Sequence, residues 1–169
     1  MYVLPQNLRS VLADQIEDPT TQDFFGGRRF RWGATSDVFF NSGGAGYALS
    51  QATLRKFVET GLDHPKCFPT KHSSMEDVFI ARCLKEVFDI GIVDTRDDEE
   101  RERFHPFGPG GHYNWRPPKE GKRDWYQQYN LLWPPKLGKD CCAPDSVSFH
   151  YLKKPATVRH IHSLLYFCD

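Results

Sequence analysis

A glycine-rich turn in the first third of the chain places the strongest constraint on the fold. Gly43, Gly44 and Gly46 follow the short apolar run Val38–Phe40 after only two polar residues. Glycine tolerates positive φ and lets another segment or a ligand approach its backbone closely. Ser50, a good N-cap residue, then precedes a helical pattern. The sequence therefore predicts a strand, a tight turn and a helix in succession.

Apolar residues at helical spacing mark the helices expected in the first half of the chain. The first follows Pro5, which suits an opening helical turn, and another opens at Ser73–Glu76 or Ser74–Asp77, two spacings typical of a capping box. The apolar faces expected for the helices are Leu8, Val11 and Leu12; Leu54, Phe57, Val58 and Leu62; and Val78, Ala81, Leu84, Val87 and Phe88.

Short apolar runs mark the expected strands. The basic aromatic stretch Arg28–Trp32 fits a strand at a sheet edge with its arginines in solvent, and Ile90–Val93 fits a buried strand. Val147–Tyr151 is a further short strand. Phe104–Gly121 is so rich in proline, glycine and aromatic residues that a long ordered loop is expected. The segment Val158–Phe167 fits a terminal helix or a terminal strand.

Length and charge exclude several classes of protein. With 169 residues, 39% of them hydrophobic, the chain can bury one ordinary core, so residues 1–169 are expected to form a single domain. Because 22 basic residues balance 22 acidic ones, no net field attracts nucleic acid or an anionic membrane. The dense mixed charges of Arg96–Arg103 fit a solvated turn or helix end. No apolar run reaches the roughly 18 residues of a membrane span. Specificity must therefore come from a local site.

The five cysteines indicate an oxidising compartment. A zinc site is disfavoured, because the only close pair is Cys141–Cys142 and structural zinc ligands lie two to four residues apart. Cys67 and Cys83 flank the capping segment Ser73–Asp77 and are predicted to form a disulfide. The pairing of Cys168 stays open. The N-terminus lacks a signal peptide, and a missing N-terminal part would reconcile it with this cysteine usage.

Several short motifs occur in an order that carries a family resemblance. They are Phe25–Phe30, Ser42–Ser50, Ser73–Asp77, Phe104–Phe107, and Cys141–Cys142 leading into Val147–Tyr151. In this order and spacing they resemble the core 1 type β1,3-galactosyltransferases, from the glycosyltransferase family that also includes fringe. Ala81 departs from the pattern, since the family often has glycine there.

The resemblance implies an α/β fold, specifically the C-terminal part of a GT-A glycosyltransferase fold with a mixed sheet, helices and an incomplete nucleotide-binding half. Tyr2–Val3 and Asn7–Arg9 are similar to the segment that follows the Asp-x-Asp motif in this family. Residues 1–169 are therefore expected to start just after that motif, and the sequence leaves open whether the chain is a truncated gene model or a real short protein.

The resemblance also implies the residues that perform the chemistry. His150 is expected to complete a manganese (Mn²⁺) site with the Asp-x-Asp acids, although a lone histidine beside aromatic residues also fits a packed core group. Asp77 is the expected catalytic base, and Glu76 is its rival or an acceptor-binding neighbour. The structural alternative for both acids is a helix cap.

Gly43, Gly44, Trp125, Tyr126 and Tyr151 are the expected substrate contacts. The glycine turn lacks the ending of a phosphate-binding loop and the spacing of a dinucleotide fingerprint. Aromatic rings suit the apolar face of a sugar, and core packing is the alternative for Trp125 and Tyr126. The resemblance further implies a vicinal disulfide within the Cys141–Cys142 pair.

The function implied by the resemblance is inverting transfer of galactose from UDP-galactose to the 3-hydroxyl of Ser/Thr-linked N-acetylgalactosamine, which makes core 1 O-glycans on the lumenal side of the Golgi membrane. The expected partners are UDP-galactose, a GalNAc-bearing glycoprotein or glycopeptide and a second copy of the chain. Nucleic acid is not expected, and a membrane is contacted only through an anchor outside this sequence. This chain alone is expected to be inactive.

Two alternatives stay open at the level of sequence. One is a fringe-like β1,3-N-acetylglucosaminyltransferase, because donor choice depends partly on residues outside this chain. The other is a non-catalytic relative that acts as a chaperone or a glycan-binding module. Retention of His150, Asp77 and the paired cysteines favours an enzyme.

Overall fold

Short strands in a mixed arrangement form the first part of the molecule. The computed structural model describes residues 1–68 and 70–166. Its first sheet has the order β5 (Tyr47–Leu49), β2 (Phe25–Gly27), β6 (Val93–Asp94), in which β2 is antiparallel to β5 and parallel to β6. Beside it, β3 (Arg29–Arg31) and β4 (Phe39–Asn41) form an antiparallel pair.

A second sheet brings the two ends of the chain together. Its order is β1 (Tyr2–Val3), β8 (Ser148–Phe149), β7 (Phe104–His105), with β1 antiparallel and β7 parallel to β8. Both three-stranded sheets are therefore mixed, which confirms the expected α/β class with mixed sheets and helices.

The helices surround these sheets. They are α1 (Pro5–Gln15), α2 (Gln51–Lys56) with a following π-helical turn η1 (Phe57–Gly61), η2 (Pro65–Cys67), α3 (Glu76–Phe88), α4 (Pro109–Asn114), α5 (Trp125–Tyr129), η3 (Gly138–Asp140) and α6 (Pro155–Tyr166). None of the helices in the described part of the chain combines the length and the apolar character that crossing a membrane requires.

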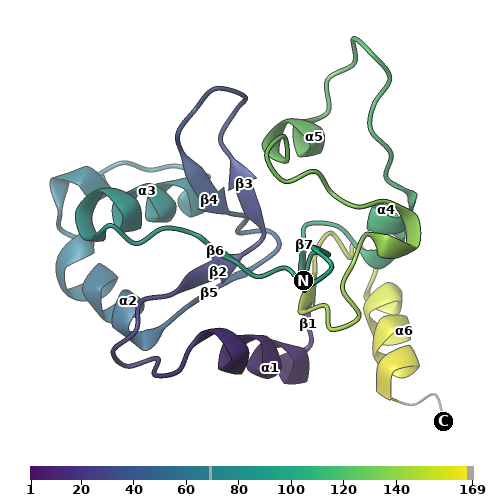
Figure 1. Ribbon diagram of the computed structural model, residues 1–169, viewed down its shortest axis with the longest axis horizontal. Helices are drawn as coiled ribbons and strands as arrows, with labels where there is room; N and C mark the ends of the chain where they lie inside the picture. The colour runs from purple at the N-terminus through teal and green to yellow at the C-terminus, as the bar shows by residue number, and fades with distance from the viewer. Residues whose placement is uncertain (69, 167–169) are drawn as a thin grey trace.

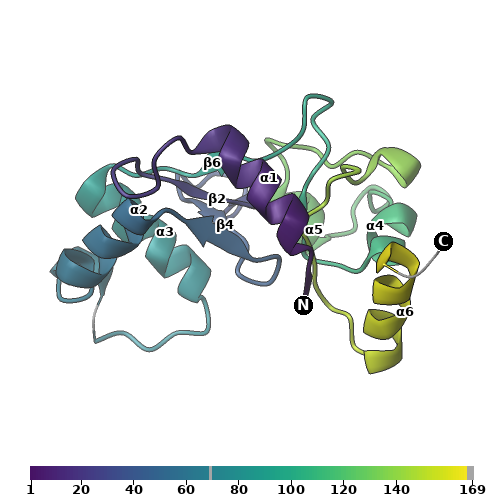
Figure 2. The same ribbon diagram turned by 90° about the horizontal axis from the view of Figure 1, so that it is seen from below.

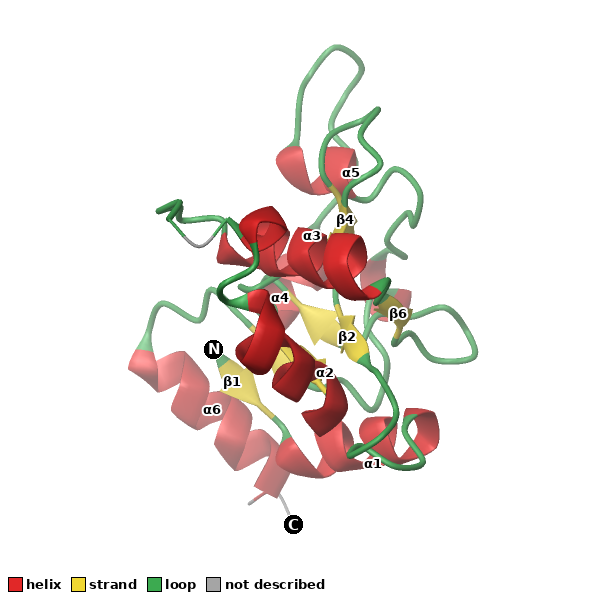
Figure 3. Ribbon diagram, turned by 90° about the vertical axis from the view of Figure 1, so that its left-hand side faces the viewer, coloured by secondary structure: helices red, strands yellow, loops and turns green. Residues whose placement is uncertain are grey.

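The elements fall into two groups, which α1 connects. In Figure 1 the sheet β5-β2-β6 lies with α2 and α3 on one side, and α4 and α6 lie with the second sheet on the other. Figure 3 shows α2 and α3 in front of β2, and Figure 2 shows α1 crossing beneath the first sheet. Val11 of α1 packs with Ala45, Phe104 and Val147, so one small core joins the two groups.

The larger core is mainly aromatic and lies between α3, the β3–β4 pair and α5. The Phe30 ring contacts the rings of Phe40 and Tyr126 at centroid separations of 5.7 and 6.1 Å. Val78 and Leu84 of α3 pack on this cluster. The apolar face expected for this helix is therefore confirmed, with Ala81 also buried.

The expected inner face of α2 is wrong for three of its four residues, since only Phe57 packs against the core. Leu54, Val58 and Leu62 are 48%, 52% and 48% exposed, whereas Thr53 is fully buried. Polar contacts set the orientation of this helix. The hydroxyls of Thr53 and of the N-cap Ser50 both accept the backbone N–H of Phe24, the residue just before β2. These hydrogen bonds turn the polar start of the helix inward and leave its apolar stripe outside.

The capping box expected at α3 is also wrong. Met75 is the N-cap residue, and its side chain makes no capping hydrogen bond. Ser73 accepts the N–H of Met75 instead of a helical amide, and Asp77 reaches the glycine turn through one of its oxygens. The acids in the first turn are therefore directed partly away from the helix that carries them.

Two further expectations are corrected, and one open alternative is resolved. Phe104–Gly121 is not a loop throughout, since it contains β7 and α4. Ile90–Val93 is largely outside a strand, because β6 begins only at Val93, although Ile90 is buried. The terminal segment is the helix α6, and the last residue expected for it, Phe167, lies outside the described residues.

A buried arginine overturns the prediction of a solvated basic strand. Arg28 is fully buried and forms an ion pair with Glu102, which belongs to the stretch expected to be a solvated turn. Its guanidinium also donates to the Tyr126 hydroxyl at 2.9 Å and to Asn130. Burying a charge costs several kcal/mol unless a partner compensates it. Arg28 therefore fixes how Glu102 and α5 sit against β3.

Removing the partner of this charge should destabilise the protein strongly. Glu102→Ala leaves Arg28 buried without its counter-ion, and we expect a loss of roughly 3–5 kcal/mol in the free energy of unfolding. Glu86→Ala is the matched control, because Glu86 forms a half-exposed ion pair with Arg82 and its loss should cost less than about 1 kcal/mol. Urea unfolding of both variants measures the difference, and equal losses would contradict the anchoring role of Arg28.

Two buried histidines adjoin this cluster. His105 and His112 lie with ring centroids 4.8 Å apart. His105 Nε2 is 3.0 Å from the Ser146 hydroxyl, and His112 Nε2 accepts the N–H of Phe107. Burial, followed by the charge of Arg28, lowers the pKa of His112 to about 3, and burial lowers the pKa of His105 well below its ordinary value. Both imidazoles are therefore neutral at pH 7.

The neutral pair predicts acid sensitivity. Since the folded-state pKa lies below the unfolded value of 6.5, the unfolded chain binds more protons in acid. The stability that this neutral group contributes is complete above about pH 6.5 and is lost as the pH falls toward 3, at up to about 1.4 kcal/mol per pH unit and histidine. In His112→Gln we expect a slope of unfolding free energy against pH that is smaller by roughly 1 kcal/mol per unit between pH 6 and 4. Denaturation series of the two proteins give both slopes, and parallel curves would show that His112 titrates normally.

Candidate active site

The glycine turn occupies the junction between the two sheets. It starts after β4, where the N–H of Ser42 donates to the carbonyl of Arg28 at 2.8 Å, and closes where Gly46 N–H donates to Gly43 at 3.1 Å. Gly46 has φ of +84°, a value that favours glycine. Ala45 is buried in the small core. The turn is therefore held firmly, with Gly43 and Gly44 as its partly exposed rim.

Both candidate carboxylates border this rim. Asp77 accepts the N–H of Gly43 through Oδ2 and the N–H of Val78 through Oδ1, each at 2.9 Å. Glu76 accepts the hydroxyl of Tyr47 at 2.9 Å. A Cβ atom at Gly43 would lie 2.3 Å from Glu76 Oε1. A side chain at Gly43 would therefore displace the Glu76 carboxylate from its present position beside the turn.

Tyr47 serves as a hydrogen-bond donor in this arrangement. Burial, followed by the neighbouring Glu76 carboxylate, raises the pKa of Tyr47 above its ordinary value. Its hydroxyl therefore keeps its proton and orients Glu76.

His150 lies on the other side of the same turn. A Cβ atom at Gly44 would be 2.9 Å from His150 Nδ1, so only glycine leaves room for the imidazole. The backbone N–H of His150 donates to His105 at 3.0 Å, which fixes the residue just after β8. Nδ1 is buried and has no hydrogen-bond partner among the described residues. Burial lowers the pKa of His150, which favours the neutral imidazole, the form that binds metals.

The described residues supply only part of a metal site. Residues 1–68 and 70–166 contain no group of three or more His, Cys, Asp and Glu side chains placed to hold a metal ion. The unpartnered Nδ1 of His150 fits one coordination position, because neutral imidazole is a common ligand of divalent metals. The manganese site stays a prediction that needs further ligands.

An exposed aromatic surface adjoins His150. Tyr151 is 56% exposed, lies 4.3 Å from the His150 ring between centroids, and stacks on Phe107 at 6.1 Å. Trp125, 44% exposed, contacts the other side of Phe107 at 5.6 Å. The structure therefore brings together Trp125 and Tyr151 through Phe107, which sequence reasoning placed only in a motif. The sequence signal that was available for Phe107 is the motif Phe104–Phe107, which also contains His105.

Tyr126 does not share this surface. It is 1% exposed, and its hydroxyl accepts a hydrogen bond from Arg28. The expectation of a substrate contact is therefore corrected in favour of core packing, because no face of the ring is free for a sugar. Helical geometry explains the contrast with Trp125, since adjacent residues of α5 point in different directions.

The cysteines are joined in two pairs. One disulfide links Cys67 to Cys83 and ties η2 to α3, and the other links the neighbours Cys141 and Cys142. Cys142 is bridged to Glu102 through the backbone, so the vicinal pair lies beside the counter-ion of Arg28. Cys168 lies outside the described residues.

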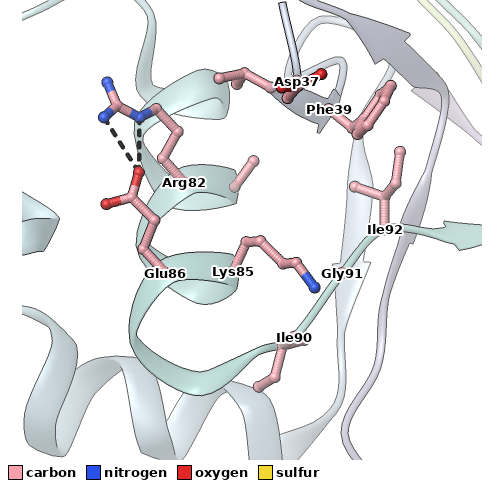
Figure 4. A pocket seen from close by; sticks show the side chains of 10 residues that line it. Asp37, Phe39, Arg82, Lys85, Glu86, Ile90, Gly91 and Ile92 are labelled. Carbon is pink, nitrogen blue, oxygen red and sulfur yellow. Dashed lines mark hydrogen bonds and ion pairs between the residues drawn. The ribbon is translucent and has the colours of Figure 1, made fainter.

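A hollow of about 540 Å³ lies apart from these residues. Phe39, Ile90 and Ile92 supply its apolar walls, and the ion pair of Arg82 and Glu86 borders it (Figure 4). It opens on a different face of α3 from the one that carries Glu76. We therefore exclude it from the candidate active site.

The disulfide between Cys67 and Cys83 should be detectable and stabilising. It closes a loop with a sequence separation of 16, for which the chain-entropy model gives roughly 3 kcal/mol. We expect the double variant Cys67→Ser, Cys83→Ser to lose about this much unfolding free energy. Mass spectrometry of unreduced protein from a secretory host should show the linked peptides, and two free thiols would contradict the bond.

Comparison with known proteins agrees with the motif order. No family model matches the chain. The sequence is 38% identical over 154 residues to the protein named glycoprotein-N-acetylgalactosamine 3-beta-galactosyltransferase 1 of Xenopus laevis. The match covers 89% of this chain and 39% of that protein, so the chain spans about two fifths of the length of its relative. The resemblance carried by the motifs is thereby confirmed, and the chain is a relative of this glycoprotein-N-acetylgalactosamine 3-beta-galactosyltransferase over nearly all of its own length.

Proposed function

We propose that the chain supplies the catalytic base and part of the sugar-binding surface of an inverting galactosyltransferase, which uses UDP-galactose and acts on GalNAc-bearing glycoproteins. The observation that carries this proposal is the glycine turn with Asp77 on one side and His150 on the other. The name of the Xenopus relative supports the reaction class and the acceptor. The mixed sheets are compatible with part of a GT-A fold, which we include in the proposal.

In this proposal Asp77 accepts a proton. The 3-hydroxyl of the acceptor attacks C1 of galactose, its proton passes to Asp77, and the bond from C1 to the diphosphate oxygen breaks on the opposite face. A carboxylate has about four lone-pair sites, so Asp77 retains free positions beyond the two backbone amides that it already accepts. Those amides hold it in one orientation, and positioning is a large part of the effect of a general base.

The aromatic surface would orient the sugar. Trp125 and Tyr151 are exposed, and Phe107 supports both rings from below. Aromatic faces pack well against the C–H groups of a pyranose. Because Tyr151 adjoins His150, a sugar on this surface lies beside the imidazole and the glycine turn.

A divalent metal such as Mn²⁺ would neutralise charge on the departing diphosphate when bound. His150 would hold it through Nδ1, and the remaining ligands would be the Asp-x-Asp acids that the family resemblance implies. We therefore propose that the 169-residue chain alone is inactive. The disulfides suit the oxidising lumen of the Golgi, where we place the longer protein.

Replacement of the base tests this proposal. The assay protein is the Xenopus relative with its matching segment exchanged for this chain, and the variant is Asp77→Asn. We expect turnover of UDP-galactose onto a GalNAc-peptide to fall by at least ~10²-fold, the lower end for loss of a general base, while UDP binding stays nearly constant. Glu76→Gln is the matched control on the same helical turn and should affect turnover less. Near-normal turnover in Asp77→Asn, with unchanged UDP binding, would reject Asp77 as the base.

A further inference from the structure

A second hollow of about 370 Å³ opens beside the candidate carboxylates. We name it the aromatic hollow and define it by Tyr47, Phe68, Lys71, Glu76 and Phe79, with the disulfide of Cys67 and Cys83 in its wall. Ligand sites commonly measure about 300–1,000 Å³, so this one has room for one or two side chains. The proposed reaction does not account for it.

The walls of the aromatic hollow are held in place covalently. The Phe68 and Phe79 rings contact each other edge to face, with their centroids 5.4 Å apart. Phe79 belongs to α3, whereas Phe68 follows η2 and is adjacent to Cys67, whose disulfide partner Cys83 lies on α3. The bond therefore keeps the Phe68 wall beside the helix, so the hollow does not depend on weak loop contacts.

The hollow carries a positive side chain, Lys71, on its aromatic edge, and a negative one, Glu76, at the edge beside the glycine turn. The Lys71 ammonium lies 5.6 Å from the Phe68 centroid and 5.0 Å from that of Phe79. Among the described residues Lys71 makes no ion pair, whereas the nearby Arg82 is paired with Glu86. A cation over aromatic rings at an exposed edge suits an anionic group carried on an apolar ligand.

The position of the hollow places it on the acceptor side of the candidate carboxylates in the proposed reaction. Tyr47 and Glu76 line the hollow and also border the glycine turn, because the Tyr47 hydroxyl donates to Glu76 and a Cβ atom at Gly43 would meet Glu76 Oε1. His150 lies against Gly44, on the other side of the turn. If the diphosphate is bound beside His150, the aromatic hollow lies beyond the carboxylates, on the side from which the acceptor hydroxyl must come.

We propose that the aromatic hollow binds the peptide part of the acceptor. An apolar side chain near the glycosylated residue packs on the walls that Phe68 and Phe79 give the hollow, and an acidic side chain next to it pairs with Lys71. The assignment to an acceptor rests on the proposed function. The apolar walls favour a peptide side chain over the sugar itself, because a sugar would leave many hydroxyl groups without partners.

A charge-swap cycle tests the proposal without using catalysis. Two labelled peptides without sugar share the pattern Leu-Thr-X, where X is aspartate or lysine, and fluorescence anisotropy measures their binding to the 169-residue chain. We expect Lys71→Glu to weaken the aspartate peptide roughly 3–5-fold and to strengthen the lysine peptide by a similar factor, as the loss and reversal of one exposed ion pair imply. Phe79→Leu should weaken both peptides.

Lys85→Glu is the control, because Lys85 is an exposed lysine of α3, the helix that carries Phe79, and lies in the other hollow, where its ion-pair partner is the exposed Asp89 (Figure 4). It should leave both affinities unchanged, and circular dichroism verifies that each variant is folded. Absence of binding by either peptide, or equal effects of Lys71→Glu and Lys85→Glu, overturns the proposal. A failed Asp77→Asn test together with a positive charge-swap cycle would reject the proposed reaction and keep the hollow as a peptide site.

Discussion

The buried guanidinium of Arg28 is the interaction on which the candidate site depends. Its side chain binds Glu102, Tyr126 and Asn130, and its carbonyl accepts the N–H of Ser42 where the glycine turn begins. Arg28 therefore joins three parts of the molecule. They are α5, the segment before β7 that contains Glu102, and the glycine turn that separates Asp77 from His150. A buried charge has few arrangements that compensate it, so it specifies the relative placement of these segments more narrowly than apolar packing would.

Shape complementarity at the turn adds a second constraint. At Gly43 the missing side chain admits Glu76, and at Gly44 it admits His150. The acids come from the start of a helix and the imidazole from the end of a strand, so the turn alone sets how far apart they lie. The chemistry expected of a base and of a metal ligand thus depends on two positions that carry no functional group themselves.

Sequence reasoning found the residues at this site but not the reason for their arrangement. The α/β class follows from the family resemblance, the first helix and the apolar face of α3 follow from local spacing, and the structure agrees with all three. Arg28 could not be placed from sequence, because its partner Glu102 is distant in the chain and lies in a stretch that appears solvated by its charge pattern. The face of α2 was misassigned for a related reason, since the hydroxyls of Ser50 and Thr53 bind Phe24 and outweigh the apolar stripe. In each case a long-range polar contact overrides a local apolar pattern.

The described residues account for one part of the proposed reaction and leave another part to other groups. In the proposed reaction Asp77 accepts a proton while the aromatic surface and the aromatic hollow hold the acceptor, and all of these parts lie within the described residues. A general base contributes about 10²–10⁴-fold and positioning can contribute more. Neutralising a diphosphate is a different task, for which His150 offers a single nitrogen. In the proposed reaction the chain is therefore the acceptor side of the active site, and the charge of the donor must be met by groups other than its described residues.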